Sequence, residues 1–388
     1  MKYAKEIARF IEEREVEAKE YLKRMVNTDC YSYDKEGVNQ IGMILQEFLK
    51  KYDIPFVTRE NKDFGNHIIA TIKGGKPGKI VLMGHQDTVF PKDTVSERPY
   101  FEDGKFAYGP GVSDMKGSLV SMIIAAAAVK EYAGAHMCDI ELVFTPDEEI
   151  GSPISKSVIQ ERTRDALGVF NMEAARPDGS VVTARKGSAH MRFDIEGKAS
   201  HSGVAIEDGI SAIDELAHKV LKIKSLMDNE KGVTVNIGTV TGGTANNTVA
   251  PNATGTVHVG FWRLKDYEEL TGKVQEIVDE SYVEGTHATL TLGAGILPME
   301  RTENVQKIYD VVKDAANFLN LPITETETKG AADAGFAASL GVPTICGMGP
   351  VGGKWHSKDE YLVLDTLIPR MQLLAISMVL YSKSCQLN

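Results

Sequence analysis

The chain has 388 residues, which is more than one hydrophobic core usually serves, so we expect two domains. Hydrophobic residues make up 43% of it and charged residues 25%, as in ordinary soluble globular proteins. The net charge is -11 and no stretch of clustered Lys or Arg stands against it, which argues against nucleic acid and anionic membranes as partners.

The N-terminal segment carries charges throughout and lacks the apolar core of a signal peptide. No uncharged run elsewhere is long enough to cross a membrane. The four cysteines lie far apart and form no CxxC pair, so neither a disulfide framework nor a thiolate zinc site is indicated. We therefore expect a soluble protein of the cytoplasm.

The first half of the chain alternates helical and strand-like patterns. Amphipathic or apolar periodicity predicts helices over 5–25, 37–52 and 117–132. Short β-branched and apolar runs predict strands over 67–72, 79–83, 140–144 and 169–172, and the first two are expected to be neighbours because only the turn-like segment 73–78 separates them. Such alternation predicts a mixed, mostly parallel α/β sheet flanked by helices.

The pattern changes near residue 185. Alternating runs over 189–195, 233–240 and 254–261 and helical patterns over 209–226 and 266–283 predict the β-α-β-β-α-β order of a ferredoxin-like α+β unit. A helical pattern over 305–319 and an apolar segment over 343–346 then resume the earlier style. The simplest division is a small domain, 185–298, inserted into a larger one made of 1–184 and 299–388.

Residues that bind divalent metals recur at the ends of apolar runs. His85 and Asp87 stand two apart after one predicted strand, so their side chains point the same way. Asp114 lies in a glycine-rich turn before the apolar helix, where Asp is also a common helix cap. Taken alone, neither motif is specific for a metal site.

Three further motifs follow the same pattern. Three successive acids, ending in Glu148 and Glu149, follow a strand and repel one another unless cations neutralise them, although a solvated acidic turn is equally plausible for that segment alone. Glu173 and His356 are by themselves typical of surface residues. Together the motifs supply two imidazoles and enough carboxylates for two open metal sites, of the kind that suits catalytic Zn²⁺, Co²⁺ or Mn²⁺.

At this point the sequence resembles the dinuclear zinc metallopeptidase family of glutamate carboxypeptidases, aminoacylases, acetylornithine deacetylase and succinyl-diaminopimelate desuccinylase. The resemblance covers nearly the whole chain and rests, in order, on GHQDTV, GPGVSDMKG, PDEEIGS, NME, GKASHSG, GGTANNTVAP, FWRLKDYEEL and GGKWHSKDEYL. The last of these motifs and the compact inserted domain are most similar to the glutamate carboxypeptidase branch.

The resemblance implies a role for each matching residue. His85 and Glu173 become the terminal ligands of one Zn²⁺, and Glu149 and His356 those of the other. Asp114 becomes the bridging ligand and is followed in relatives by a cis peptide bond, here Asp114–Met115. Glu148 becomes the general base and Asp87 the partner that orients His85.

The inserted domain of relatives forms a homodimer and reaches across to the active site. His201 matches the histidine that stabilises the tetrahedral intermediate, and Asn247 and Arg263 match residues that grip the substrate, with Arg263 on its carboxylate. We therefore expect a metal-dependent amidohydrolase that acts on small peptides or N-acyl amino acids.

The sequence bears on three alternative functions. The same machinery could serve an N-acyl-amino-acid deacylase instead of a carboxypeptidase. A non-catalytic metal-binding dimer of this fold would be favoured by a missing base or bridge, yet Glu148 and Asp114 are both present. A serine hydrolase of the nucleophile-elbow type is excluded because the sequence contains no GxSxG.

Overall fold

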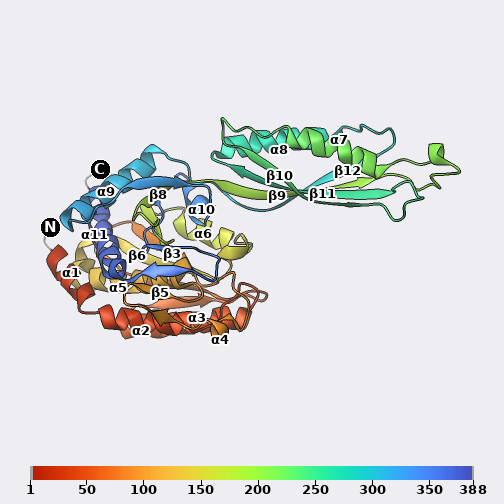
Figure 1. Cartoon of the computed structure of the whole chain (residues 1–388). Helices are drawn as coiled ribbons and strands as arrows, with labels where there is room; N and C mark the ends of the chain where they lie inside the picture. Colours follow the sequence, from red (N-terminus) through yellow and green to blue (C-terminus); the bar gives the residue numbers. More distant parts are fainter. Residues whose placement is uncertain (1–2, 387–388) are drawn as a thin grey trace. The chain divides into compact units, whose positions relative to one another are not determined.

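The computed structural model describes residues 3–386, which fold into two compact units. The first unit consists of residues up to 184 together with 300–328 and 332–388, and the second of 185–299 with the short segment 329–331 (Figure 1). The predicted inserted domain, residues 185–298, ends one residue before the main segment of the second unit does. No local pattern pointed to 329–331 as part of the second unit.

A six-stranded sheet forms the centre of the first unit. Its strand order is β1 (Phe56–Arg59), β2 (His67–Ile72), β6 (Asp139–Thr145), β3 (Lys79–His85), β7 (Gly168–Asn171) and β14 (Thr344–Ile345). The strands β6, β3, β7 and β14 are parallel, and β1 and β2 form an antiparallel edge. The apolar runs of β2, β6, β3, β7 and β14 are buried, as strands covered by helices on both faces require, whereas the edge strand β1 is mostly exposed. The predicted mixed, mostly parallel sheet is confirmed.

The expectation that β2 and β3 are neighbours is wrong, because β6 lies between them. The intervening turn passes across the start of β6 and is held there by Asp139. The Asp139 carboxylate accepts hydrogen bonds from Lys73 Nζ at 2.7 Å and from Gly74 N at 2.9 Å. The Asp139 amide in turn donates to the Gly78 carbonyl at 3.0 Å. A short connection therefore does not produce a hairpin here.

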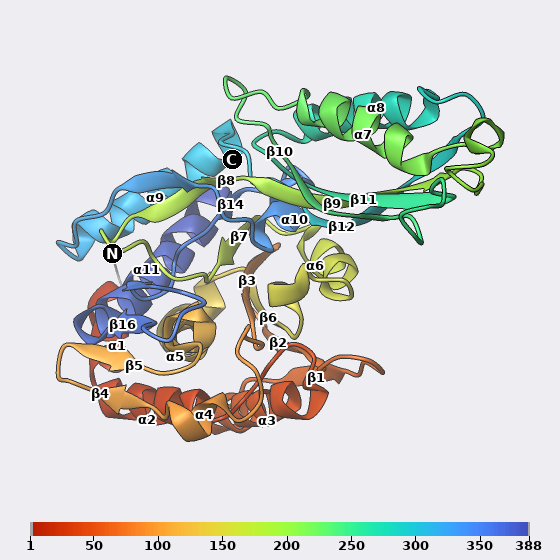
Figure 2. The ribbon, with the colours of Figure 1, turned by 45° about the vertical axis from the view of Figure 1, so that its right-hand side comes forward.

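Helices cover both faces of this sheet. α5 (Gly117–Ala133) and α11 (Leu367–Cys385) lie on one side, and α6 (Ser155–Thr163) and α10 (Ala334–Ala338) on the other (Figure 2). The remaining helices are α1 (Ala4–Glu12), α2 (Glu15–Val26), α3 (Lys35–Lys51), α4 (Thr94–Glu97) and α9 (Glu303–Phe318). Two small sheets complete the unit: β8 (Val181–Arg185) with β13 (Glu325–Thr328), and β15 (Gly352–Gly353), β16 (Tyr361–Val363), β5 (Phe106–Tyr108) and β4 (Phe101–Glu102).

The helix expected over 5–25 is two helices, α1 and α2. Arg14 separates them because its side chain turns back onto the end of α1. Its guanidinium lies 3.2 Å from the ring centroid of Phe10, and its Nη1 donates to the Phe10 carbonyl at 2.8 Å. This hydrogen bond satisfies the Phe10 carbonyl, which lies in the last turn of α1, where carbonyls lack an amide partner within the helix.

Two helical stretches are long and apolar enough to cross a membrane by length and composition alone. They are Val112–His136 and Leu364–Cys385, and 94% and 67% of their most apolar windows are buried inside the structure. The first stretch contains α5 and the second α11, and these two helices contact each other beside the sheet. Their apolar character is thus accounted for by packing in the protein core.

The second unit has the predicted β-α-β-β-α-β order. Its elements are β9 (Gly187–Glu196), α7 (Ala212–Lys224), β10 (Thr234–Gly242), β11 (Asn252–Phe261), α8 (Leu264–Asp279) and β12 (His287–Ile296). The antiparallel sheet runs β10, β11, β9, β12, and both helices cover the same face of it (Figure 1). Buried and exposed residues alternate along β9 because only that face is packed.

Candidate metal centre

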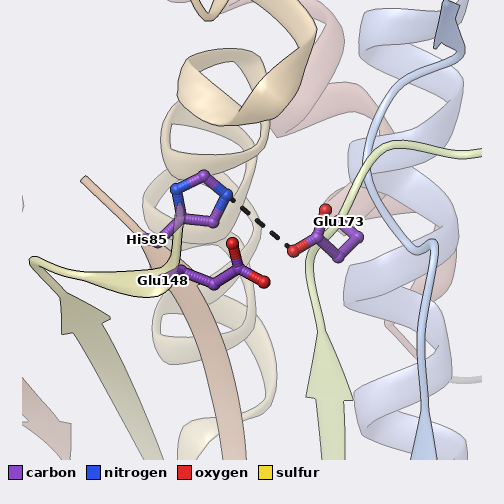
Figure 3. A group of neighbouring side chains, drawn as sticks. All are labelled: His85, Glu148 and Glu173. Atoms are coloured by element: carbon purple, nitrogen blue, oxygen red, sulfur yellow. Dashed lines mark ion pairs between the residues drawn. The ribbon is translucent and has the colours of Figure 1, made fainter. Parts of the chain in front are cut away.

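Three side chains from adjacent parallel strands meet beyond the carboxyl edge of the large sheet. His85 is the last residue of β3, and Glu148 and Glu173 follow β6 and β7. One ligand atom of each lies within 4.8 Å of the others. The side chains point toward one another, with His85 Nε2 3.8 Å from a Glu173 oxygen (Figure 3). Parallel strands thus bring together residues that are far apart in the sequence.

Asp114 lies between the two predicted histidine ligands. Its Oδ1 is 3.2 Å from His85 Nε2, and its Oδ2 is 3.4 Å from His356 Nε2. A Glu149 oxygen lies 3.0 Å from the same His356 nitrogen. Because the two oxygens of Asp114 face different histidines, this carboxylate has the arrangement of a ligand shared by two cations.

The composition of the cluster fits divalent cations. Four carboxylates, those of Asp114, Glu148, Glu149 and Glu173, surround two imidazoles, and close carboxylates repel unless protons or cations neutralise them. Imidazole nitrogen and carboxylate oxygen are ligands that Zn²⁺, Co²⁺ and Mn²⁺ accept. Within residues 3–386, no cysteine belongs to a candidate metal-binding group.

The protein groups of the cluster strongly perturb one another. Burial would raise the pKa of Asp114, but hydrogen bonds from His356 and His85 outweigh it and hold the pKa below its ordinary value. The hydrogen bond with Asp114, followed by that with Glu149, raises the pKa of His356 to about 10. Burial raises the pKa of Glu149 to about 7. Such mutual shifts are common at functional sites.

Glu148 differs from the other carboxylates in its surroundings. Burial, with Glu173 as a neighbouring like charge, raises the pKa of Glu148 well above its ordinary value. Within the described residues, its side chain forms no ion pair closer than 4 Å. Its backbone amide, by contrast, donates a hydrogen bond to the Asp87 carboxylate. A carboxylate whose pKa is raised in this way can hold a proton that an ordinary glutamate would already have lost.

Asp87 contacts more groups than the one predicted for it. His85 Nδ1 lies 3.0 Å from the Asp87 carbonyl and 3.4 Å from its carboxylate, so the carbonyl is the nearer acceptor. This contact directs Nε2 of His85 toward Asp114. The carboxylate accepts from the amides of Glu148 and Glu149, each at 3.2 Å, and from Ser32 Oγ at 2.7 Å. Asp87 therefore also holds the turn that carries the two glutamates.

Glu360 is a buried residue of the site that the sequence did not reveal. Its carboxylate accepts from the amides of Gly111 at 3.0 Å, Ser113 at 2.9 Å and Asp114 at 3.0 Å. These bonds hold the loop that presents Asp114, whose peptide bond to Met115 is cis as expected. Burial, followed by the nearby Asp114 carboxylate, raises the pKa of Glu360 to about 7. In the sequence it reads as one acid of a polar segment.

Asp333 is a second such residue, and it lies behind the Glu148 turn. It accepts hydrogen bonds from Ser152 Oγ and, at 3.3 Å, from Thr145 Oγ1. Ser152 follows Gly151 at the end of the turn η3 (Glu148–Ile150), and both residues have positive φ angles. Asp87 at the start and Asp333 at the end therefore fix the turn from two sides.

The other three predicted residues belong to the second unit. The loops of His201 and Asn247 are paired there, since Ser202 N donates to the Asn247 carbonyl at 3.0 Å. Arg263 precedes α8 and donates to the Asp266 carboxylate from Nε at 2.7 Å and from Nη2 at 2.9 Å. Its guanidinium is thus oriented by a buried aspartate, which the sequence motif did not show.

The chain matches the peptidase family M20/M25/M40 over residues 81–378. Carboxypeptidase G2 of Pseudomonas sp. (strain RS-16) is 29% identical over 369 residues, which cover 92% of this chain and 88% of that protein. A probable succinyl-diaminopimelate desuccinylase of Staphylococcus aureus (strain MRSA252) is 30% identical over 200 residues, or 48% of this chain and 47% of that protein.

Solved structures share the fold. That of the Bacillus subtilis YXEP protein, described as a dinuclear metal binding peptidase from the M20 family, superimposes with a TM-score of 0.70 at 17% identity. The match covers 96% of this chain and 99% of that one. Both units of the fold are therefore shared with a known structure.

Proposed function

The chain belongs to peptidase family M20/M25/M40, and from this premise we propose that it is a two-metal hydrolase that cleaves the amide bond beside a C-terminal amino acid with a free carboxylate. Membership of this family identifies the protein as a hydrolase of the metallopeptidase type. The substrate panel described below identifies the side chain that is accepted beside the scissile bond.

One observation carries the proposal, namely the convergence of the five predicted ligands and Glu148 in one unit. His85 and Glu173 would hold one cation, and Glu149 and His356 the other, with Asp114 shared. We propose Zn²⁺ as the metal, with Co²⁺ and Mn²⁺ as cations that the same donors accept. Bound there, the cations would polarise the scissile carbonyl and activate water.

The chain's own residues would carry the proton transfers. Glu148 lies beside His85 and Glu173 and would accept a proton from the attacking water, then donate it to the leaving amine nitrogen (Figure 3). Asp87 and Asp333 would keep its turn in place through the contacts described above. His201 is proposed to stabilise the oxyanion, and Asn247 and Arg263 to bind the substrate.

The first-choice reaction is that of a carboxypeptidase. The match to carboxypeptidase G2 covers most of both chains and supports this choice. Arg263, held by Asp266, would receive the free carboxylate that the substrates of both candidate reactions carry, so it supports either one.

The second candidate is an N-acyl-amino-acid deacylase. It is supported by the 30% identity with the probable succinyl-diaminopimelate desuccinylase over about half of each chain. Both reactions place a free carboxylate beside an amide bond, so the ligand set cannot separate them.

A substrate panel separates the two candidates. Protein loaded with Zn²⁺, Co²⁺ or Mn²⁺ is assayed for ninhydrin-reactive amine release against dipeptides that vary the C-terminal residue and against N-acetyl and N-succinyl amino acids. We expect dipeptides or larger peptides to be cleaved with higher kcat/KM. Cleavage of the acyl amino acids alone would replace the first choice with the second.

We propose that the second unit forms a homodimer. Its edge strands β10 and β12 each carry unpaired backbone groups and exposed apolar residues, among them Val240 and Leu292. Unprotected edges of this kind favour pairing with another chain. Sedimentation equilibrium should give twice the chain mass, and a mass of one chain across the micromolar range would reject the dimer.

A further inference from the structure

A pocket of about 690 Å³ lies in the first unit beside the loop that carries His356. Its lining contains three cationic side chains and one acidic side chain: Arg98, Lys354, Lys358 and Asp359. None of these residues belongs to the ligand set. In a chain with a net charge of -11, a local excess of two positive charges in a hollow is unusual and points to an anionic ligand.

The cations of the pocket are not neutralised by the protein. Among residues 3–386, Arg98, Lys354 and Lys358 form no ion pair within 4.0 Å of a carboxylate. Arg98 is nevertheless fixed in place. It donates to the Ser357 carbonyl at 3.4 Å and to the Lys358 carbonyl at 2.8 Å, and its guanidinium lies 4.6 Å from the ring centroid of Phe90. Its charge is therefore preorganised and still lacks a counter-ion.

Aromatic rings form the wall of the pocket. The rings of Phe106 and Tyr361 meet edge to face with centroids 5.1 Å apart. Tyr361 packs against the backbone of Gly353, where a Cβ atom would lie 2.7 Å from its hydroxyl oxygen. Tyr108 is tied by its hydroxyl to the Asp103 carboxylate at 3.0 Å. The wall is thus rigid, while Lys354 and Lys358 are exposed and able to reach a ligand.

The pocket and the metal centre share one loop. Lys354 and Lys358 stand two residues before and after His356, and Lys354 and His356 both have positive φ angles, of 56° and 58°. Ser357 Oγ donates to the Lys354 carbonyl at 2.6 Å and closes this loop. Two lining residues of the pocket and a predicted metal ligand therefore belong to the same short loop.

We propose that this pocket binds a carboxylate or phosphate group and, because the C-terminal carboxylate is assigned to Arg263, that this second anionic group is carried on the acyl side of the substrate. This assignment rests on the proposed hydrolytic function, since it supposes a scissile amide at the metal centre. The preferred substrate would then carry two anionic groups: the C-terminal carboxylate and an acidic group on the other side of the amide.

Matched substrate pairs test the charge preference. Glu-X is compared with Gln-X, and N-succinyl-X with its succinamoyl isostere, where X is the C-terminal residue that is cleaved best. Each pair differs in one charge and hardly in shape. We expect kcat/KM to be at least about tenfold higher for the acidic member, which corresponds to roughly 1.4 kcal/mol. Hydrolysis of the neutral member tests the proposed function separately.

A double variant with Lys354→Gln and Lys358→Gln tests the assignment to this pocket. We expect the ratio of kcat/KM for the acidic substrate to kcat/KM for the neutral one to fall towards one, with any remaining preference due to Arg98. The matched control is Lys5→Gln with Lys307→Gln, which removes the same total charge from two exposed lysines on α1 and α9. A ratio that falls equally in the control would indicate a long-range field, and would overturn the pocket as its cause.

Inorganic phosphate distinguishes the two possible sources of the anion. If the charge preference is absent but phosphate raises the Tm of the wild-type protein and not of the Lys354→Gln, Lys358→Gln variant, the pocket binds a free anion and the substrate assignment is overturned. If neither the charge preference nor the difference in Tm is found, the pocket is not an anion site. Metal content is measured in every variant, so that loss of metal is recognised.

Discussion

At the residue scale, Glu148 differs from the five proposed metal ligands, because it lies beside them without being assigned to either cation. Its carboxylate lies in one cluster with His85 and Glu173. The turn that carries it is held by hydrogen bonds to the carboxylates of Asp87 and Asp333. A side chain in that position can exchange a proton without leaving a metal uncoordinated. The proposed base can therefore be separated experimentally from the proposed ligands.

Glu148→Gln should abolish turnover while the protein still binds metal. The amide has nearly the same shape but cannot accept a proton, and general base catalysis contributes about 10²–10⁴ in rate. The measurements are kcat on the best substrate and metal stoichiometry by elemental analysis. In Glu149→Gln, by contrast, metal content should fall. Undiminished turnover in Glu148→Gln would remove this residue from its proposed role.

Asp333→Ala should lower kcat with little change in KM or metal content. Loss of its carboxylate leaves Ser152 Oγ without an acceptor, so the turn that carries Glu148 loses one of its two anchors. Small misplacements of a catalytic group can cost about a hundredfold in rate, and we expect a decrease of about tenfold to a hundredfold. Asp333→Asn, which keeps one acceptor, should recover part of the rate.

The control for Asp333 is Asp310→Asn, an exposed aspartate on α9. It should leave kcat unchanged. Equal loss of kcat and metal in Asp333→Ala would show that Asp333 maintains the fold of the ligand set, and would contradict a specific effect on the base.

At the element scale, the second unit is stabilised by a buried ion pair within α7 whose partners also contact the chain at the end of α8. Lys219 and Glu215 lie on α7 with fully buried side chains and an Nζ to Oε1 distance of 2.7 Å. Lys219 Nζ also donates to the carbonyls of Ile277 and Val278, each at 2.9 Å, at the end of α8. Glu215 accepts from the amides of Tyr282 and Val283. The pair thus joins α7 to the chain that leaves α8.

Lys219→Met should destabilise the second unit by about 3–5 kcal/mol, because it leaves the buried Glu215 charge uncompensated. Urea unfolding followed by Trp262 fluorescence in a Trp355→Phe background reports on this unit, since the chain has only these two tryptophans. Lys222→Met, on an exposed turn of the same helix, should cost less than about 1 kcal/mol. Equal midpoints for the two variants would refute the structural role of the pair.

At the scale of the whole molecule, the metal centre couples stability to pH. Burial raises the pKa of Glu149, Asp333 and Glu360 to about 7 each, and hydrogen bonds raise the pKa of His356 to about 10. A raised folded-state pKa contributes stability that is present below the unfolded pKa and is lost as pH rises through the folded value. All four groups therefore act in the same direction.

Protein treated with a chelator should have a lower Tm at about pH 8 than at about pH 5.5. Divalent metal should reverse this trend, because deprotonated ligands bind cations more tightly and binding to the folded state alone stabilises it. Calorimetry at both pH values, with and without Zn²⁺, measures the effect. A gap between the two forms that narrows as pH rises would contradict the proposed ligand set.

Local patterns were sufficient for much of this protein. Apolar periodicity predicted the strands β2, β3, β6 and β7 and the helices α3, α5 and α9. The switch of pattern near residue 185 predicted the second unit's element order, and motifs resembling a known family pointed to His85, Asp114 and Glu173. These features are local because a strand, a turn or a metal-binding side chain is encoded by residues close in the sequence.

The tertiary structure decided the rest. β6 lies between β2 and β3, where the Asp139 carboxylate accepts hydrogen bonds from a turn more than 60 residues earlier. Glu360 and Asp333 resemble ordinary polar residues in the sequence, and only their buried contacts with the loops of Asp114 and Glu148 show their importance. The physical reason is that a hydrogen bond between distant segments leaves no periodic pattern in either one.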